Sequence, residues 1–328
     1  MKKLFKAMAI ALASTSLFAF AACDKTTGIK FEDVPEEEQA TVYNDFQTKF
    51  EAATAEYSDP TTFYSSYTGS LTAVNTNLMT EQSNGVKETA TTKASVAITA
   101  EKTEGDVTTP ATFEYAYSTT VKSKALLTTG SLTDMNVTMS QYITGGQYYQ
   151  KQDVTFPSYP AQSTTQSLQQ ALSYSQETAI RAALPGIKMI SLVKDVFEND
   201  LTTVKAEYSD LTLGTGKDGS AYKISFNLYC LKITDTVSYC GYDTTNLVAT
   251  LRTYGIDADD VRANYNITYQ IVLTSDGKID YIDTIMKQIA DTEESLAYKK
   301  AFSSFEYTEK TYIYDSLTID FPSDLASY

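Results

Sequence analysis

Acidic side chains are the most numerous groups in this chain that could do chemistry, and histidine is missing altogether. The 328 residues include 41 Asp and Glu and no His. Without imidazole, Ser-His-Asp and Cys-His nucleophiles are excluded, and zinc, copper and non-haem iron sites lose a common ligand. Carboxylates, tyrosine, lysine and hydroxyl groups remain, together with calcium held by carboxylate oxygens.

Four aspartates form the densest acidic group. Asp257, Asp259 and Asp260, with Asp243 nearby, are oxygen ligands of the kind that calcium prefers. The full EF-hand loop is absent, so a solvated acidic loop explains the group better. Residues 276–280 also contain two aspartates, but a hairpin turn accounts for the Asp-Gly pair there. We therefore expect neither a metal site nor a cofactor.

Catalysis by paired carboxylates is the enzymatic alternative. With 41 acidic residues some pair always exists, and its separation, which would decide the matter, is not readable from sequence. Ser-Lys and other lysine-based catalysis leave no recognisable signature here. We expect no catalytic residues and assign the chain to the non-enzymes, with a carboxylate-based hydrolase as the third interpretation of its function.

Tyrosine is unusually frequent, with 25 residues, whereas tryptophan is absent. Tyr148 with Tyr149, and Tyr312 with Tyr314, could form aromatic platforms for a sugar. At the spacing of a strand such pairs more often pack across neighbouring strands. Both interpretations stay open at this point.

Two cysteines, Cys230 and Cys240, flank Asp235 at equal distances. Folding the chain back at Asp235 places them opposite each other in a hairpin, which favours a disulfide in an oxidising compartment. The alternative is two buried thiols on separate strands. No CxxC spacing is present, so the bond would be structural.

The N-terminus has the pattern of an export signal. Lys2, Lys3 and Lys6 precede an apolar run over residues 7–20, and small residues then lead to Cys23. This resembles the signal of bacterial lipoproteins, in which the cysteine is acylated, with palmitate among the chains, and becomes the new N-terminus. The resemblance implies a signal peptide over residues 1–22 and lipidation of Cys23.

Charge and anchor together predict where the chain resides. The net charge of −15 repels nucleic acid and anionic headgroups, so we expect no nucleic-acid partner. Membrane contact should come from the lipid on Cys23 instead of a basic patch. We expect a monomer on the extracytoplasmic face of the cell membrane, with residues 23–34 as a tether and residues 35–328 as a single β-rich domain.

A helix is predicted directly after the tether. Pro35 suits the first helical turn, and three glutamates follow it. Phe46, Phe50 and Ala53 recur at helical spacing, which predicts an apolar stripe packed on a sheet. The helix should end before Pro60.

Residues 63–156 alternate as strands, with turns expected at Asn84-Gly85 and Gly145-Gly146. Their second face is rich in Thr and Ser, which favours an antiparallel sheet with one wet face. The centre reads as a pair of helices over residues 165–183 and 187–199. Strands then resume near Val204 and continue to Phe321, with another turn at Asp276-Gly277.

This element order resembles the LolA/LppX-like lipoprotein carriers. Two local features support it: the Asp276-Gly277 hairpin and a final strand over residues 317–322. The resemblance implies an α+β fold, mainly antiparallel β, in which a curved open half-barrel holds a central helical pair and an N-terminal helix. It also implies an apolar cavity between sheet and helices that holds acyl chains.

The leading interpretation is therefore a non-catalytic protein that binds a lipid or other amphipathic ligand. Its cavity should be lined by inward-facing apolar residues, namely Phe113, Tyr115, Phe197, Leu228 and Ile271. The alternative is a cell-surface interaction module that binds glycan or protein through exposed tyrosines.

Overall fold

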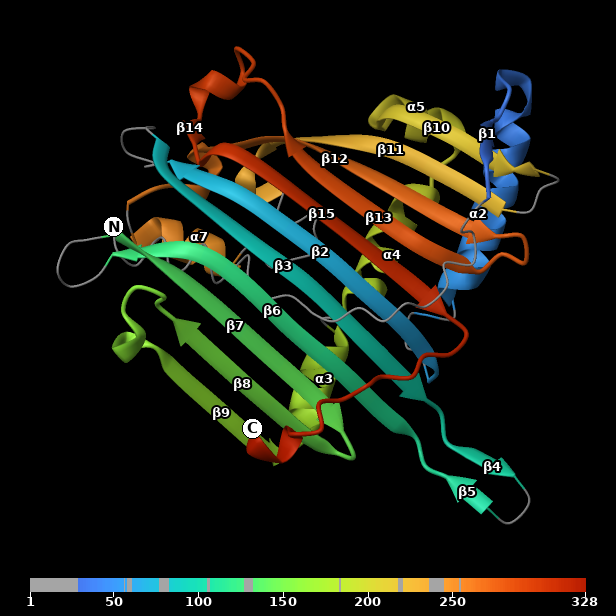
Figure 1. Ribbon diagram of the computed structural model, residues 1–328. Helices are drawn as coiled ribbons and strands as arrows, with labels where there is room; N and C mark the ends of the chain where they lie inside the picture. Colours follow the sequence, from blue (N-terminus) through green and yellow to red (C-terminus); the bar gives the residue numbers. More distant parts are fainter. Residues whose placement is uncertain are drawn as a thin grey trace.

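One large open β-sheet organises the chain (Figure 1). A computed structural model describes residues 29–55, 57, 61–76, 83–104, 107–126, 132–182, 184–217, 221–235, 245–253 and 255–328. Cys23, Cys240 and Asp243 lie outside these residues, so the lipidation and the disulfide stay predictions. Cys230 is buried on one of the central strands.

The sheet has 13 strands in the order β1-β10-β11-β12-β13-β15-β2-β3-β6-β7-β8-β9, with β14 beside β12. All neighbours are antiparallel except β12 and β14. The strands are β1 (Phe31–Asp33), β2 (Phe63–Thr76), β3 (Ser83–Thr99), β6 (Thr112–Leu126), β7 (Leu132–Thr144), β8 (Gln147–Thr155), β9 (Thr164–Ala171), β10 (Ser209–Gly216), β11 (Ala221–Lys232), β12 (Val261–Thr274), β13 (Ile279–Gln288), β14 (Lys299–Lys300) and β15 (Phe302–Tyr314). A separate hairpin, β4 (Lys102–Glu104) with β5 (Val107–Thr109), projects from one end of β3 and β6.

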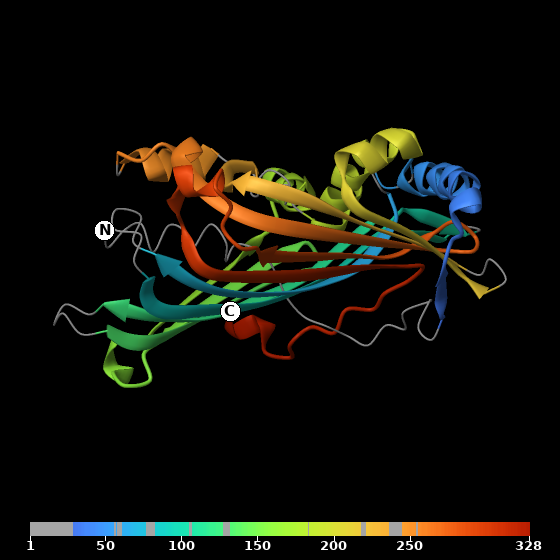
Figure 2. The same ribbon diagram turned by 90° about the horizontal axis from the view of Figure 1, so that it is seen from above.

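The helices gather on one side of the twisted, curved sheet, and the C-terminal segment crosses the other side (Figure 2). We call these sides the helix face, which carries Tyr67, and the outer face, which carries Thr68. The helices are α2 (Gln39–Ala55), α3 (Tyr174–Ala182), α4 (Pro185–Phe197), α5 (Leu201–Glu207) and α7 (Thr245–Thr253), with the 3₁₀ turns η1 (Glu36–Glu38), η2 (Pro160–Gln162), η4 (Ala258–Asp260), η5 (Ser295–Ala297) and η6 (Leu325–Ser327). Within the described part of the chain, every helix is too short or too polar to cross a bilayer.

The predicted N-terminal helix is confirmed. Pro35 precedes η1, and α2 follows directly. Phe46, Phe50 and Ala53 are buried, so the predicted stripe is the face that packs inward. Just before it, at the end of the predicted tether, β1 pairs with β10 and starts the sheet.

The central helical region differs from the sequence prediction in its first half. Residues 165–171, expected to be helical, belong to β9, and the helix there is the shorter α3. The segment is polar and mostly exposed, so it has little apolar surface to hold a helix on the sheet, whereas pairing with β8 satisfies its backbone. α4 is confirmed, and it begins at Pro185 as the first-turn preference of proline requires.

Three further predictions are corrected. The strand expected from Val204 starts later, because residues 201–207 form α5, which Asp200 caps by accepting a hydrogen bond from the Thr203 N–H at 2.8 Å. The Asn84-Gly85 turn does not form, since both residues lie within β3. The final strand over residues 317–322 is also wrong: β15 ends at Tyr314, and Ile319 instead packs on the outer face against Tyr142.

Two predicted hairpin turns are confirmed. Gly145 and Gly146 join β7 to β8 with positive φ angles of 57° and 72°. Gly277 joins β12 to β13 with a φ of 82°. These backbone conformations favour glycine, which is why the sequence signals them so clearly.

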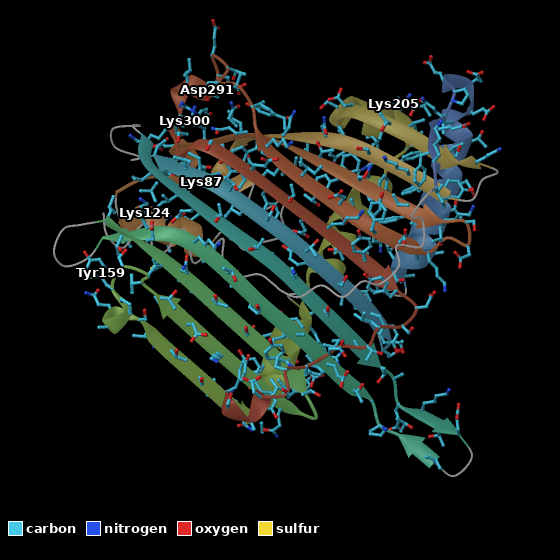
Figure 3. The ribbon with its side chains drawn as sticks, viewed as in Figure 1. Lys87, Lys124, Tyr159, Lys205, Asp291 and Lys300 are labelled. Carbon is cyan, nitrogen blue, oxygen red and sulfur yellow. The ribbon has the colours of Figure 1, made fainter. Side chains whose placement is uncertain are left out.

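A buried arginine fixes the chain between β13 and β14. Arg262 on β12 donates to the carbonyl oxygens of Ser295 and Tyr298, and its Nε lies 3.4 Å from Asp291 Oδ1. Lys300 Nζ pairs with the same carboxylate at 2.8 Å (Figure 3). Partial burial acts to raise the pKa of Asp291, but the Lys300 hydrogen bond and the charges of Arg262 and Lys300 hold it below its ordinary value.

Candidate functional site

The predicted cavity residues all belong to the core on the helix face. Phe113 and Tyr115 lie on β6, Leu228 on β11, Ile271 on β12 and Phe197 on α4. Four of them are buried in one apolar cluster, and Leu228 is partly buried against it. The structure thus brings these residues to one side of the sheet, but spreads them from β6 to β11.

At two of these positions side chains from the helices fill the space. The Phe197 ring lies 5.1 Å from both Phe46 and Phe50, in edge-to-face contacts. At the other end, the Arg181 guanidinium of α3 stacks 4.5 Å from the centre of the Phe113 ring. α2, α3 and α4 therefore pack closely on the sheet at both places.

Between these two ends, a row of polar positions crosses the helix face. The row runs over five neighbouring strands, β13, β15, β2, β3 and β6, and each member pairs directly with the next. Its members, which we call the polar row, are Thr284, Glu309, Gly69, Thr92 and Thr119. The exposed fractions of its four side chains are 2%, 6%, 6% and 2% in that order, omitting glycine.

The rows on either side of the polar row are mostly apolar on β11 to β13. One contains Ile224, Ile271 and Ile282, and the other contains Ile267 and Met286. α4 packs against β15 and β2, the strands that carry Glu309 and Gly69. A polar band therefore crosses an interior that is otherwise largely apolar.

A chain of hydrogen bonds holds the carboxylate of the polar row. Tyr307 donates to Glu309 Oε2 at 2.6 Å, and the hydroxyls of Tyr67 and Tyr307 are 2.7 Å apart. Because the single Tyr307 proton is directed to the carboxylate, Tyr67 is the donor in the second bond. Tyr67 thus donates to Tyr307, and Tyr307 donates to Glu309.

Two hydroxyls beside this chain have no hydrogen-bond partner among the described residues. They are Thr284 Oγ1 in the polar row and Thr311 Oγ1 next to it, with exposed fractions of 2% and 1%. A buried polar group without a partner costs roughly 1–3 kcal/mol. Such groups are expected where a ligand or a water completes the hydrogen bonding.

Glycine is required at the centre of the polar row. A Cβ at position 69 would lie 2.7 Å from Thr92 Cγ2 and 2.8 Å from the Tyr67 hydroxyl. Both distances are well below van der Waals contact. The missing side chain of Gly69 is therefore what gives the Tyr67 hydroxyl its place beside the row.

Buried tyrosines at the β6 to β8 end stay protonated. Burial raises the pKa of Tyr148 to about 12 and that of Tyr115 well above its ordinary value. Tyr148 donates to Gln150 Oε1 at 2.6 Å. These tyrosines can act only as hydrogen-bond donors and acceptors, and carry no charge at neutral pH.

The acidic group that suggested calcium has other roles in the structure. Asp257 caps η4 by accepting from the Asp259 N–H, and Asp259 pairs with Lys232 at 3.3 Å. Across the residues that the structure describes, no three His, Cys, Asp or Glu side chains lie close enough to hold a metal. Asp276 accepts a hydrogen bond from Thr274 in the hairpin turn.

The tyrosine pairs fall on different faces of the sheet. Tyr148 is buried on the helix face, while its neighbour Tyr149 is partly covered on the outer face by the cluster around Ile319. Tyr312 and Tyr314 share the outer face, with parallel rings 6.3 Å apart. Only the second pair has the geometry of a common platform.

Comparison with known proteins adds little to this picture. No family model and no curated protein matches the chain. Among solved structures, it is distantly similar to a beta-barrel-like protein of a domain of unknown function, DUF1849, from Brucella abortus, with 7% identity over 77% of this chain and 98% of that one and a TM-score of 0.22. The chain is a large antiparallel β-sheet protein with this distant resemblance.

Proposed function

We propose that this chain is a non-catalytic, lipid-anchored protein that binds an amphipathic ligand between sheet and helices, in the manner of the LolA/LppX-like carriers. The polar row is the observation that carries the proposal. It places a carboxylate and spare hydroxyls inside an apolar interior, and an amphipathic molecule matches both parts.

The polar end of the ligand would lie on the row. Thr284 and Thr311 supply two hydroxyls that lack partners among the described residues, and Glu309 accepts a hydrogen bond from a ligand hydroxyl or amide. Its apolar part would extend over Ile271 and Ile282. Pairing the two hydroxyls relieves the free-energy penalty of their burial, which favours a ligand with a polar group at this depth.

α4 controls access in this proposal. It packs on β15 and β2, over the strands that carry Glu309 and Gly69 (Figure 1). We infer that a ligand reaching the polar row displaces α4, and that its apolar part then replaces side-chain contacts that α4 makes with the sheet. The binding-competent form is one in which α4 has moved away from β2.

The proposed location follows from the signal. Lipidation of Cys23 would hold the chain at the extracytoplasmic face of the membrane, where its ligand is available. The row contains a single carboxylate, Glu309, and so lacks the second acid that a carboxylate hydrolase requires. Binding, and not turnover, is what these groups support.

Native purification followed by solvent extraction and mass spectrometry tests the proposal. We expect a stoichiometric lipid or other amphiphile, and uptake of a fluorescent fatty acid by the stripped protein. The double variant Thr284→Val, Thr311→Val should weaken that uptake about tenfold. Thr308→Val, on the outer face of the same β15, is the matched control and should not change it. A clean extract without fatty-acid uptake would refute the proposal.

A further inference from the structure

β9 ends the sheet on the side away from β1, and its open edge has no neighbouring strand among the described residues (Figure 1). Just after β9, the Leu172 N–H donates to the carbonyl oxygen of Gly146, at the turn into β8, at 2.9 Å. Backbone groups of successive residues point alternately to the two sides of a strand. The even-numbered residues of β9 therefore direct their N–H and C=O groups to β8. Those that direct them to the open edge are Thr165, Ser167, Gln169 and Ala171.

This edge lacks the devices that normally prevent pairing with another chain. Such devices are a short edge strand, charged side chains or a proline. The opposite edge has two of them, because β1 is only three residues long and contains Glu32 and Asp33. In contrast, β9 is eight residues long, and its sequence TTQSLQQA contains neither a charged residue nor a proline.

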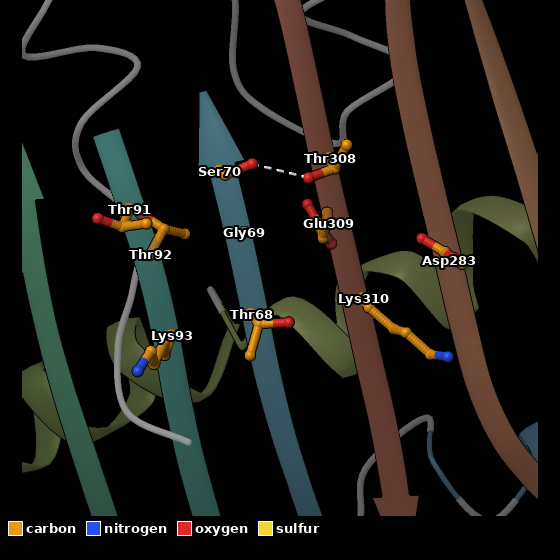
Figure 4. Close-up of a pocket in the computed structure, with 10 residues that line it drawn as sticks. All are labelled: Thr68, Gly69, Ser70, Thr91, Thr92, Lys93, Asp283, Thr308, Glu309 and Lys310. Carbon is orange, nitrogen blue, oxygen red and sulfur yellow. Dashed lines mark hydrogen bonds between the residues drawn. The ribbon is translucent and has the colours of Figure 1, made fainter. Parts of the chain in front are cut away.

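The surroundings of β9 are also without charge. No residue from Val154 to Gln176 is charged, in a chain of which 20% of the residues are. Elsewhere the sheet is charged, and Lys93, Lys310 and Asp283 line a shallow hollow on the outer face of its central strands (Figure 4). Two copies of this chain, each with a net charge of −15, are therefore repelled least where their β9 edges meet.

Exposed apolar side chains gather at the same edge. Leu168, in the middle of β9, is 44% exposed, and Tyr174, at the start of α3, is 86% exposed. Tyr159, just before η2, is 42% exposed (Figure 3). Since Tyr159 precedes β9 and Tyr174 follows it, an antiparallel pair of β9 strands brings Tyr174 of one copy to the end where the partner's Tyr159 lies. The edge is thus complementary to itself.

We propose that two copies of this chain pair antiparallel through β9 and join their sheets into one. A two-fold axis perpendicular to the sheet keeps each face on its own side, so residues that lie opposite each other must share a face. With Leu168 on the axis, it lies opposite the partner's Leu168, and Ser167 lies opposite the partner's Gln169. This register uses every open-edge residue of β9 and covers Leu168 with its own copy.

The proposed dimer is closed. The contact uses the same edge of both copies, and the β1 edge is protected, so association stops at two. This dimer takes the place of the monomer expected from the sequence, and it does not depend on the proposed ligand.

Sedimentation equilibrium of the purified chain tests the association. Because the interface is small, we expect a reversible equilibrium of monomer and dimer as the protein concentration rises through the micromolar range. Ser167→Pro removes an N–H from the open edge and leaves the bonds to β8 in place, and proline is tolerated at such positions. Leu168→Lys, which tests the edge if the proline variant does not fold, places like charges opposite each other. Each should weaken dimerisation at least tenfold, whereas Leu132→Lys, at a leucine of β7 that is 56% exposed, should leave it unchanged.

Cysteine cross-linking tests the register. On the axis the two Cα atoms of residue 168 would lie about 4.5 Å apart, which suits a disulfide. Leu168→Cys should therefore give a covalent dimer on mild oxidation, and neither the natural chain nor Leu132→Cys should do so.

Four results would overturn the proposal. They are a monomer throughout the concentration range, assemblies larger than a dimer, a dimer unaffected by both β9 variants, and equal cross-linking of Leu132→Cys. Cross-linking of Leu168→Cys in intact membranes to a different protein alone would also overturn it, and would assign the edge to that partner.

Discussion

Tyr307 donates a hydrogen bond of 2.6 Å to Glu309, two residues further along β15. Alternate residues of a strand share one face, so this bond holds the carboxylate on the helix face within its own strand. The carboxylate is 6% exposed, and the Tyr307 hydroxyl in turn lies 2.7 Å from that of Tyr67. One strand thus carries both the buried acid and the group that satisfies it.

Loss of this donor should destabilise the fold. Tyr307→Phe removes the hydroxyl while keeping the ring, and leaves Glu309 with one donor fewer in a buried position. We expect the free energy of unfolding to fall by about 1–3 kcal/mol, measured by urea denaturation followed by circular dichroism. Tyr159→Phe, at a tyrosine that is 42% exposed, is the control and should change it little. An unchanged midpoint in Tyr307→Phe would show that the bond contributes nothing.

Alanine at position 69 should be poorly tolerated. The new Cβ would approach Thr92 Cγ2 to 2.7 Å and displace the Tyr67 hydroxyl. We expect Gly69→Ala to lower the free energy of unfolding by about 1–3 kcal/mol, as overpacking usually does. At Gly214 of β10 the closest atoms would be 3.5 Å away, so Gly214→Ala provides the comparison. Equal stability of the two variants would contradict the crowding at Gly69.

The buried hydroxyls of Thr284 and Thr311, which have no partner among the described residues, should lower the free energy of unfolding of the ligand-free protein. Thr284→Val and Thr311→Val keep the shape of the side chain and remove the buried hydroxyl. For stripped protein we expect each to raise the free energy of unfolding by about 1 kcal/mol. Thr308→Val, whose hydroxyl bonds to Ser70, should not share that gain. Destabilisation by both interior variants would mean that these hydroxyls already have partners in solution.

Asp283 should give a stability that declines with rising pH. Partial burial raises the pKa of its carboxyl, and the charges of Lys310 and Lys223 offset only part of that effect. The folded chain therefore keeps this proton after the unfolded chain has lost it, and the free energy of unfolding falls as pH rises from the ordinary value of 3.8 through the raised pKa.

Asp283→Asn removes this titration. At neutral pH the variant should melt about 1–3 °C higher than the natural chain, and the difference should vanish below the ordinary aspartate pKa. Thermal melts at a series of pH values measure it. A variant that melts lower at neutral pH would show that the ionised carboxylate is stabilised in the fold instead.

The proposed disulfide can be tested by counting thiols. Cys230 is buried on β11, and Cys240 lies outside the residues that the structure describes. In denaturant without reductant we expect no reactive thiol, and one from Cys230 in the variant Cys240→Ser. That variant should also lose roughly 2–3 kcal/mol of stability. Two reactive thiols in the natural chain would exclude the bond.

Local signals in the sequence predicted much of the fold. Proline and glutamates at residues 35–38 marked the start of the first helix, and glycine pairs or Asp-Gly marked two hairpins, because each of these residue types has a backbone preference of its own. The segment that became β9 has no such signal. Its polar side chains fit a helix or an edge strand, and pairing with β8 decides between them.

The polar row could not be predicted from the sequence. Thr92 stands between Thr91 and Lys93, and Thr119 between Ser118 and Thr120, so the local sequence is polar on both faces of each strand. Both threonines nevertheless lie on the buried side. What distinguishes them is the presence of Thr284 and Glu309 on strands almost two hundred residues further along. Register across the sheet creates the row, and no single strand contains enough of it to be recognised.

The position of β1 sets how the protein would stand on a membrane. Phe31 is eight residues from Cys23, and so many residues span at most about 30 Å. With Cys23 acylated, the β1–β10 edge of the sheet would be held close to the bilayer. β9, at the opposite edge, would lie about 50 Å away across the sheet at about 4.8 Å per strand. This attachment therefore gives the molecule a near edge and a far edge, with neither broad face of the sheet laid on the bilayer.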